Sequence, residues 1–87
     1  MKIWIVLDHA DQSDDIGIYA YSTKAEAETC FRKRLEEYVT LYGKFEDSQG
    51  RTMKQCIQDM HFDDGADDWT TMKEVEVGSG APANAVF

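Results

Sequence analysis

One long segment with helical spacing and clear signals at both ends constrains this chain more than any other feature. The hydroxyl of Thr23 can accept a hydrogen bond from the free amides at a helix start, and Glu26, three residues later, completes a capping-box pattern. Gly43 is suited to the position just after a helix end. We therefore predict a helix between Thr23 and Gly43. The residues expected on its buried stripe are Ala27, Phe31, Leu35, Tyr38 and Tyr42.

Three other segments have the apolar pattern of strands. Residues 2–7 are β-branched and aromatic, which is typical of a strand buried on both faces. Residues 16–21 follow a polar run, so these two segments predict an antiparallel hairpin. Residues 69–77 alternate in the way of a half-exposed strand. Residues 51–60 have apolar spacings that could form a shorter helix.

Together these segments predict the fold class α+β. We expect a small antiparallel sheet, made of a β-hairpin and a C-terminal strand, packed on one main helix, with a second short helix as an option. A chain of 87 residues is short enough to form one domain, which we place at residues 1–77. Residues 78–87 are almost uncharged and predict a C-terminal tail, unless Val86 and Phe87 dock it on the domain.

The charge of the chain restricts its partners. Seventeen acidic residues against nine basic ones give a formal net charge of −8. Direct binding to nucleic acid or to an anionic membrane is disfavoured, because those surfaces are also negative. A basic protein partner would be attracted. The alternative is that the acidity serves solubility alone.

Nine of the acidic residues gather in or beside two polar loops. If the C-terminal strand pairs antiparallel beside the first strand, the two loops meet at one pole; parallel pairing would separate them. Such a pole could engage a basic groove that normally holds nucleic acid, or its carboxylates could simply be solvated. Cation binding is disfavoured, because the spacing of an EF-hand is missing. The nine residues are Asp8, Asp11, Asp14, Asp15, Asp59, Asp63, Asp64, Asp67 and Asp68.

Residue types that could carry catalysis or bind metal are few. His9 and His61 each have acidic neighbours and could approach one another if the two loops meet. Neither has a Ser or Cys placed beside it in a nucleophile pattern. Cys30 and Cys56 are too far apart in sequence for a zinc-ligand pair. Glycine-rich nucleotide motifs are also missing. We therefore expect no enzyme activity, no cofactor and no metal site.

No apolar run has the length of a membrane helix or of a signal peptide. We expect no membrane association and a cytoplasmic location. The two cysteines are then expected to be reduced thiols.

The aromatic side chains suggest a second surface. Trp4, Tyr19 and Tyr21 could share the sheet face that points away from the main helix. An aromatic patch exposed there would favour a partner or a second copy of the chain. Alternatively, the second helix or the tail covers it.

Residues 17–28, from the second strand into the helix cap, resemble a strand-to-helix turn of small bacterial and phage proteins of unknown function. In size, acidity and α+β type the chain resembles phage-encoded inhibitors, among them anti-CRISPR proteins and DNA mimics. This resemblance implies an inhibitor of a host or defence protein, located in the host cytoplasm if the chain is phage-encoded.

The leading hypothesis is a protein-binding inhibitor or modulator that uses an acidic surface against a basic protein partner, of which a nucleic-acid-binding protein or complex is one candidate. The alternative is a structural or regulatory homodimer, joined through the aromatic sheet face or an edge strand. A small metal-dependent enzyme is the weakest of the three. The predicted partner-binding residues are Asp11, Asp14, Asp15, Asp63, Asp64, Asp67, Asp68, Trp4, Tyr19 and Tyr21.

Overall fold

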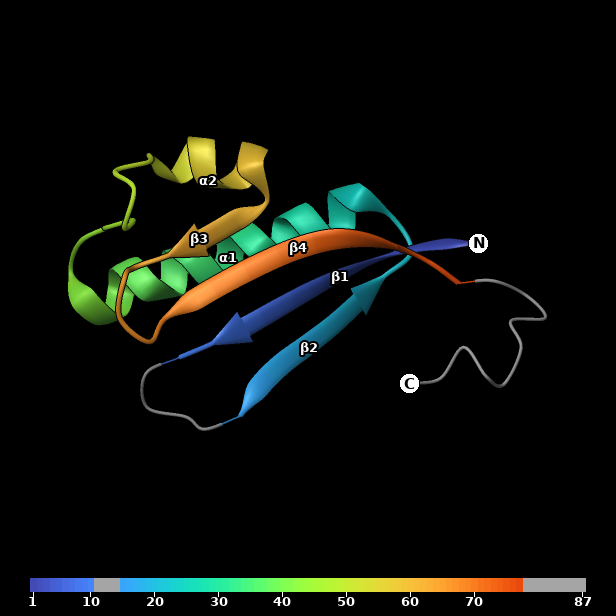
Figure 1. Ribbon diagram of the computed structural model, residues 1–87, viewed down its shortest axis with the longest axis horizontal. Coiled ribbons are helices and arrows are strands. Elements are labelled where there is room, and N and C mark those ends of the chain that lie inside the picture. The colour runs from blue at the N-terminus through green and yellow to red at the C-terminus, as the bar shows by residue number, and fades with distance from the viewer. Residues whose placement is uncertain (11–14, 78–87) are drawn as a thin grey trace.

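The strands of the protein form one antiparallel sheet in the order β2-β1-β4-β3, and helices lie along it (Figure 1). The computed structural model describes residues 1–10 and 15–77. The predicted α+β class is confirmed, with its hairpin, main helix, short helix and C-terminal strand. A short additional strand, β3, was not predicted. The elements are β1 (Lys2–His9), β2 (Ile16–Tyr21), α1 (Lys24–Tyr42), α2 (Met53–Asp59), β3 (His61–Asp63) and β4 (Trp69–Glu76).

Helix α1 begins and ends where the sequence predicts. The Thr23 hydroxyl accepts a hydrogen bond from the backbone N–H of Glu26 (3.2 Å). The Glu26 carboxylate accepts from the hydroxyls of Ser22 (3.1 Å) and Thr23 (2.9 Å). Gly43 adopts a left-handed conformation (φ 75°), which glycine tolerates, and its N–H donates to the Val39 carbonyl (2.7 Å).

The buried side of α1 matches the predicted stripe except at its end. Tyr42 lies at the surface, with its ring centroid 4.6 Å from that of Tyr38. The buried residues of α1 are Ala27, Cys30, Phe31, Leu35 and Tyr38.

Within residues 1–10 and 15–77, no helix combines the length and apolar character needed to cross a membrane.

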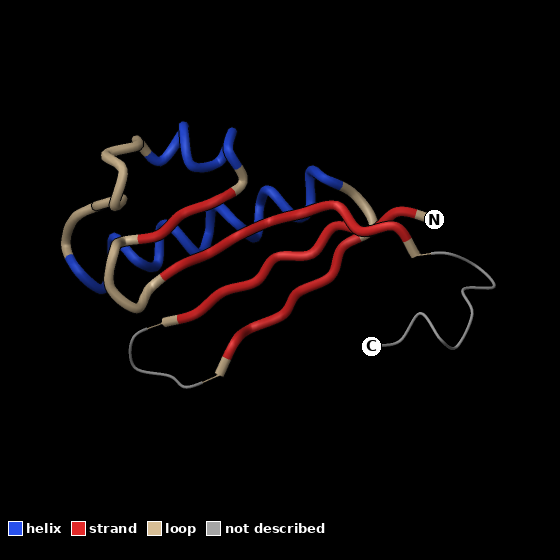
Figure 2. The backbone as a smooth tube through the Cα atoms, in the orientation of Figure 1, coloured by secondary structure: helices blue, strands red, loops and turns tan. Residues whose placement is uncertain are grey.

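The sheet has an inner face, covered by both helices, and an open face. Val6, Phe62 and Met72 point inward and are at most 2 % exposed. α1 contacts β1, β2 and β4, whereas α2 contacts β3 and α1 (Figure 2). The prediction that residues 2–7 form a strand buried on both faces is wrong. Val6 is the one fully buried residue of β1, because the helices cover only the inner face.

Helix α2 is shorter than the predicted segment 51–60 because a capping box starts it at Met53. The backbone N–H of Thr52 donates to the Gln55 side chain (2.8 Å), and the N–H of Gln55 donates to the Thr52 hydroxyl (3.2 Å). Met60 ends the helix in a left-handed conformation (φ 58°), and the chain turns back into β3.

Strand β3 was missed because three residues carry no measurable alternation. Phe62 opposes Thr70 of β4 and is 1 % exposed. Its ring lies 5.0 Å from that of Phe45 and 4.9 Å from that of Tyr38, measured between centroids. The strand is thus held by this aromatic cluster as well as by its backbone pairing.

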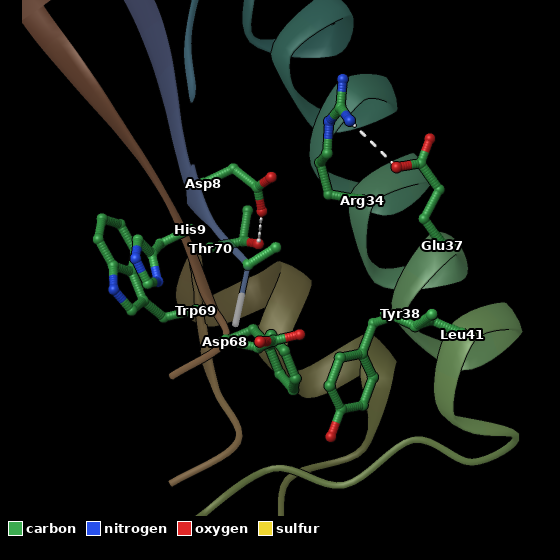
Figure 3. Close-up of a pocket in the computed structure, with 11 residues that line it drawn as sticks. Asp8, His9, Arg34, Glu37, Tyr38, Leu41, Asp68, Trp69 and Thr70 are labelled. Carbon is green, nitrogen blue, oxygen red and sulfur yellow. Dashed lines mark hydrogen bonds and ion pairs between the residues drawn. The ribbon is translucent and has the colours of Figure 1, made fainter. Parts of the chain in front are cut away.

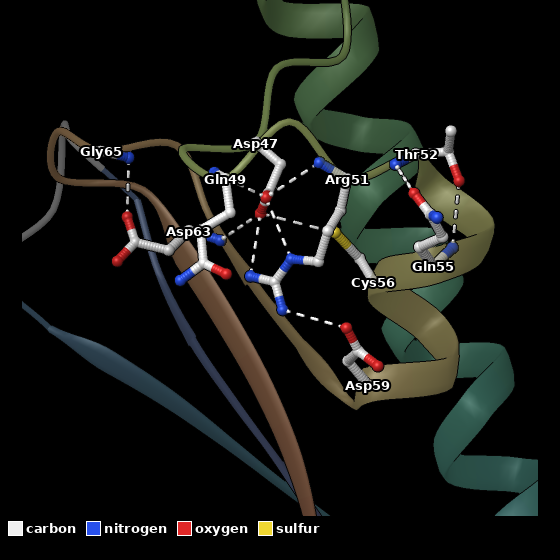
Figure 4. A network of polar contacts seen from close by, with 9 residues as sticks. All are labelled: Asp47, Gln49, Arg51, Thr52, Gln55, Cys56, Asp59, Asp63 and Gly65. Carbon is white, nitrogen blue, oxygen red and sulfur yellow. Dashed lines mark hydrogen bonds and ion pairs between the residues drawn. The ribbon is translucent and has the colours of Figure 1, made fainter.

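A buried carboxylate joins the 44–52 loop to α2 and β3 (Figure 4). One oxygen of Asp47 accepts from the N–H groups of Gln49 (2.9 Å) and Arg51 (3.2 Å), and from Arg51 Nε (3.0 Å). The other oxygen accepts from Arg51 Nη2 (3.2 Å) and the N–H of Asp63 (3.4 Å). Cys56 Sγ donates to it as well (3.5 Å). We call this network the Asp47 clamp.

The Asp47 clamp shifts the protonation of its members. Burial alone would raise the pKa of the Asp47 carboxyl, but the hydrogen bonds from Arg51 and from backbone amides outweigh it and hold the pKa well below its usual range. Burial, together with the Asp47 charge, raises the pKa of the Cys56 thiol to about 12. Cys30 and Cys56 are both free and buried.

Replacing Asp47 by Asn should lower the free energy of unfolding by about 3 kcal/mol, because Arg51 then loses the charged partner of a buried ion pair. Urea denaturation at neutral pH measures this. Asp59→Asn is the matched control: its carboxylate accepts from the same guanidinium (3.3 Å) but is 57 % exposed, so the loss should stay below about 1 kcal/mol. Equal losses for the two variants would contradict the clamp.

The depressed pKa of Asp47 also predicts how stability depends on pH. Below about pH 4 the unfolded carboxylate takes up a proton while the folded one stays ionised, so stability decreases as the pH falls. This decrease should be shallower in Asp47→Asn than in the wild-type protein. Thermal melts between pH 7 and pH 2.5 test it, and parallel curves would speak against it.

Candidate protein-binding surface

The antiparallel pairing of β1 with β4 brings the flanks of the two acidic loops to one end of the sheet. His9, at the end of β1, is opposite both Trp69 of β4 and Ile16 of β2. The strand ends that flank the two loops are therefore at the same end of the sheet, opposite the N-terminus (Figure 1). We call this end the acidic pole and define it by residues 8–9, Asp15 and residues 63–69.

For the described residues, the structure thus agrees with the single pole expected from antiparallel pairing. Asp15 is exposed beside the start of β2. The predicted partner-binding residues Asp11 and Asp14 lie outside the described residues. Asp59 is in α2, in contact with Arg51.

Asp64 organises the turn of the second acidic loop. Its Oδ1 accepts from the N–H groups of Ala66 (2.8 Å) and Asp68 (3.3 Å), and its Oδ2 accepts from the Tyr38 hydroxyl (3.3 Å). Burial, followed by the Asp64 charge, raises the pKa of Tyr38 to about 12. The Tyr38 phenol therefore remains a protonated donor to Asp64.

The other carboxylates of this loop differ in their access to solvent. Asp63 accepts from the N–H of Gly65 (2.7 Å), and Asp68 is only 6 % exposed. Asp67 is exposed. Of the four loop acids predicted to meet a partner, Asp67 is therefore the one best placed to do so. Asp63 and Asp64 hold the turn in shape.

Three contacts join the end of β1 to the start of β4 and to the loop before it. The Thr70 hydroxyl donates to Asp8 Oδ1 (2.7 Å). The His9 ring stacks on Trp69, with centroids 5.9 Å apart and planes 11° apart, and its Nδ1 bonds the Asp67 carbonyl. The strand ends and the acidic loop are thus joined into one unit.

His61 does not join this unit, because β4 lies between β3 and β1. His9 and His61 therefore do not approach one another, which the sequence had left as an option. Among residues 1–10 and 15–77, no cluster of three or more His, Cys, Asp or Glu side chains could hold a metal ion.

A small polar pocket lies between the acidic pole and α1 (Figure 3). Its volume is about 120 Å³, below the range of roughly 300–1,000 Å³ that is usual for ligand pockets. Arg34 lies 4.5 Å above the Tyr19 ring centroid, and its Nη1 donates to Glu37 (3.0 Å). Its Nε is buried and has no hydrogen-bond partner among the described residues. The pocket is also lined by Asp8, Asp68 and Thr70.

The three aromatic candidates share one sheet face, but it is the inner one. Trp4 opposes Tyr21, and Val6 opposes Tyr19. Because Val6 enters the core, strand alternation puts the other three on its side. Trp4, Tyr19 and Tyr21 pack against the core. The prediction that they face away from the main helix is wrong.

Aliphatic side chains occupy the face that was predicted to be aromatic. Ile16 is 52 % exposed and Ile18 is 68 % exposed. Lys73 stands among these side chains, opposite Ile5. The alternation in residues 16–21 places Ile16 and Ile18 on one face of the strand and the tyrosines on the other. It does not indicate which of the two faces the helix covers. The aliphatic residues of the open face are Ile3, Ile5, Leu7, Ile16, Ile18, Ala20 and Val75, and His9, Trp69, Thr71 and Lys73 stand on the same face.

Comparison with models of protein families, with curated proteins and with solved structures finds no match to this chain. Its function is therefore inferred from its own sequence and from the geometry of its surface.

Replacing Asp64 by Ala should lower the free energy of unfolding by about 2 kcal/mol, because the turn amides and the Tyr38 hydroxyl lose their acceptor. Asp67→Ala, at an exposed position of the same loop, should change it by less than about 0.5 kcal/mol. Urea denaturation of both variants compares them. A stability loss at Asp67 as large as at Asp64 would refute this division of roles.

Proposed function

We propose that the protein is a binding module that inhibits or modulates a basic protein partner by docking its open face. Its binding surface combines two features: the aliphatic open face, and the carboxylates at the acidic pole. The observation that carries the proposal is the exposure of Ile16 and Ile18 on a sheet face that no described helix covers.

An apolar sheet face in water is unfavourable unless another surface covers it for at least part of the time. The open face spans three strands, which are about 4.8 Å apart and rise about 3.3 Å per residue. It is therefore wide enough to form the centre of a small protein interface. A polar rim around an apolar centre is the usual anatomy of such interfaces.

The charge of the protein indicates the kind of partner. With a net charge of −8, it is attracted to surfaces rich in Lys and Arg. Asp15 and Asp67 are exposed at the acidic pole and suit a polar rim that meets such groups. The partner expected is a protein with an apolar patch bordered by basic side chains, and nucleic-acid-binding proteins supply such clusters of basic side chains. This agrees with the resemblance to anti-CRISPR proteins and DNA mimics.

Several acidic residues have structural roles, which limits how far the acidic pole can imitate the phosphates of a nucleic acid. Asp64 and Asp63 use carboxylate oxygens inside the loop, and Asp68 is buried. Fewer carboxylates are thus available to imitate a row of phosphates. We therefore assign the binding energy mainly to the open face and the attraction at long range to the acidic residues.

The experiment is capture of partners from a lysate of the cells in which the protein occurs, followed by titration of the purified partner. The double variant Ile3→Thr/Val75→Thr removes apolar surface from the β1–β4 part of the open face and should raise the dissociation constant at least about fivefold. Leu41→Thr, at an exposed apolar position on α1, is the control and should leave it unchanged. Equal binding by all three proteins would overturn the proposal.

The acidic contribution is tested with Asp15→Asn/Asp67→Asn. These changes should weaken binding several-fold at low ionic strength and much less at about 0.5 M salt, where the Debye length is only a few ångströms. Glu28→Gln/Glu36→Gln, on α1, is the control with the same change in net charge. If this control weakens binding as strongly, the attraction comes from the net charge and not from the pole.

A further inference from the structure

The two edges of the sheet are protected very differently. At β3, the backbone N–H of Asp63 donates to Asp47 Oδ1 (3.4 Å), and the Asp63 carbonyl accepts from the N–H of Ser48 (2.7 Å). The 44–52 loop thus covers this edge, and the strand is only three residues long. Short strands and covering loops are the devices by which proteins prevent further strands from adding.

Within residues 1–10 and 15–77, the β2 edge has none of these devices. β2 is six residues long and contains no charged residue and no proline. β1 is the one strand of the described residues that pairs with it. Alternate residues of β2 therefore direct their N–H and C=O groups away from the sheet, as on any edge strand. Ile16 and Ile18, the most exposed isoleucines, flank these groups on the open face.

We propose that β2 pairs antiparallel with β2 of a second copy of this chain, which forms one continuous sheet across a two-fold axis. The axis is normal to the sheet, since this keeps like faces on the same side. Residue 18 then lies opposite itself on the axis, Ile16 lies opposite Ala20, and Gly17 lies opposite Tyr19. Each of these cross-strand pairs has both side chains on one face.

A second copy fits this edge because the edge is self-complementary and uncharged. Two copies with a net charge of −8 repel one another, so contact is less costly where charge is absent. The sequence of β2, Ile-Gly-Ile-Tyr-Ala-Tyr, is such a place. Antiparallel pairing of a strand with itself also satisfies the outward amides and carbonyls of both copies at once.

The dimer adds to the proposed function without depending on it. Because the axis is normal to the sheet, both sets of helices lie on one side and both open faces on the other. The open face doubles in width, and the two acidic poles lie at opposite ends of it. A partner could still bind a monomer if the dimer did not form, and the dimer could form without a partner.

The dependence on salt concentration distinguishes dimerisation from the binding of a basic partner. Screening reduces the repulsion between two copies, so dimerisation should strengthen as salt rises from about 20 mM to about 500 mM. Binding of a basic partner should weaken over the same range. The sign of the salt effect therefore tells which association is measured.

Sedimentation equilibrium of the full chain tests the proposal. The wild-type protein should show a monomer–dimer equilibrium in the micromolar range, because an interface of this size is small. Ile18→Lys places a charge at the edge and should lower the association constant at least about tenfold. Val75→Lys places the same charge on the open face in β4 and should leave it nearly unchanged. A monomer at millimolar concentration in the high-salt buffer would overturn the proposal.

A loss of association in Val75→Lys as large as in Ile18→Lys would also overturn it, because two copies would then pack face to face. Circular dichroism verifies that each variant is folded.

The register of the paired strands is tested with Ile18→Cys and Ile16→Cys under oxidised glutathione, which is reduced as the intermolecular disulfide forms. The native cysteines are buried. Ile18→Cys should cross-link readily and Ile16→Cys poorly, whereas equal yields would indicate random collision and exclude the paired strands.

Discussion

The packing of one long helix against one face of the sheet is the interaction on which the rest of this structure depends. Phe31 and Leu35 of α1 are fully buried, as are Val6 and Phe62 from the sheet. In the part of the chain that the structure describes, no second layer of helices lies on the other side of the sheet. The inner face therefore receives Trp4, Tyr19, Tyr21 and Phe62, and the open face keeps aliphatic side chains such as Ile16 and Ile18 in contact with solvent.

The acidity of the chain has an internal use as well as an external one. Asp47 is removed from solvent and joins a loop, a short helix and an edge strand through its hydrogen bonds with Arg51 and with backbone amides. Asp64 likewise accepts hydrogen bonds from backbone amides of the loop before β4. Carboxylates are suited to this task because each oxygen can accept several hydrogen bonds from a tightly turned backbone. Net charge alone therefore overstates the acidic surface that a partner can meet.

The open face, the acidic pole and the β2 edge result from one arrangement. β1 lies between β2 and β4, so the end of β1 and the starts of β2 and β4 lie at one end of the sheet. β2 is left at the edge of the sheet, whereas the opposite edge is covered by the loop that contains Asp47. A basic partner at the face and a second copy at the edge would thus use adjacent but separate parts of the same sheet.

The sequence by itself determined the elements that depend on local chemistry. The cap at Thr23, the glycine at position 43 and the helical spacing between them fix α1, because capping and periodicity act over a few residues. The alternation in β2 and β4 identified those strands for the same reason. The short strand β3 has no such local signal, and it forms because Phe62 fills the core beside Tyr38 and Phe45.

Only the tertiary structure decided which face of each strand the helix covers and which acids remain exposed. The separation of Tyr19 and Tyr21 from Ile16 and Ile18 could be derived from the sequence, but the side that α1 would cover could not. That choice depends on contacts between segments distant in the chain, such as Val6 with the core. In the same way, Asp47 and Asp67 are the same residue type in polar loops, and only long-range packing buries one and exposes the other.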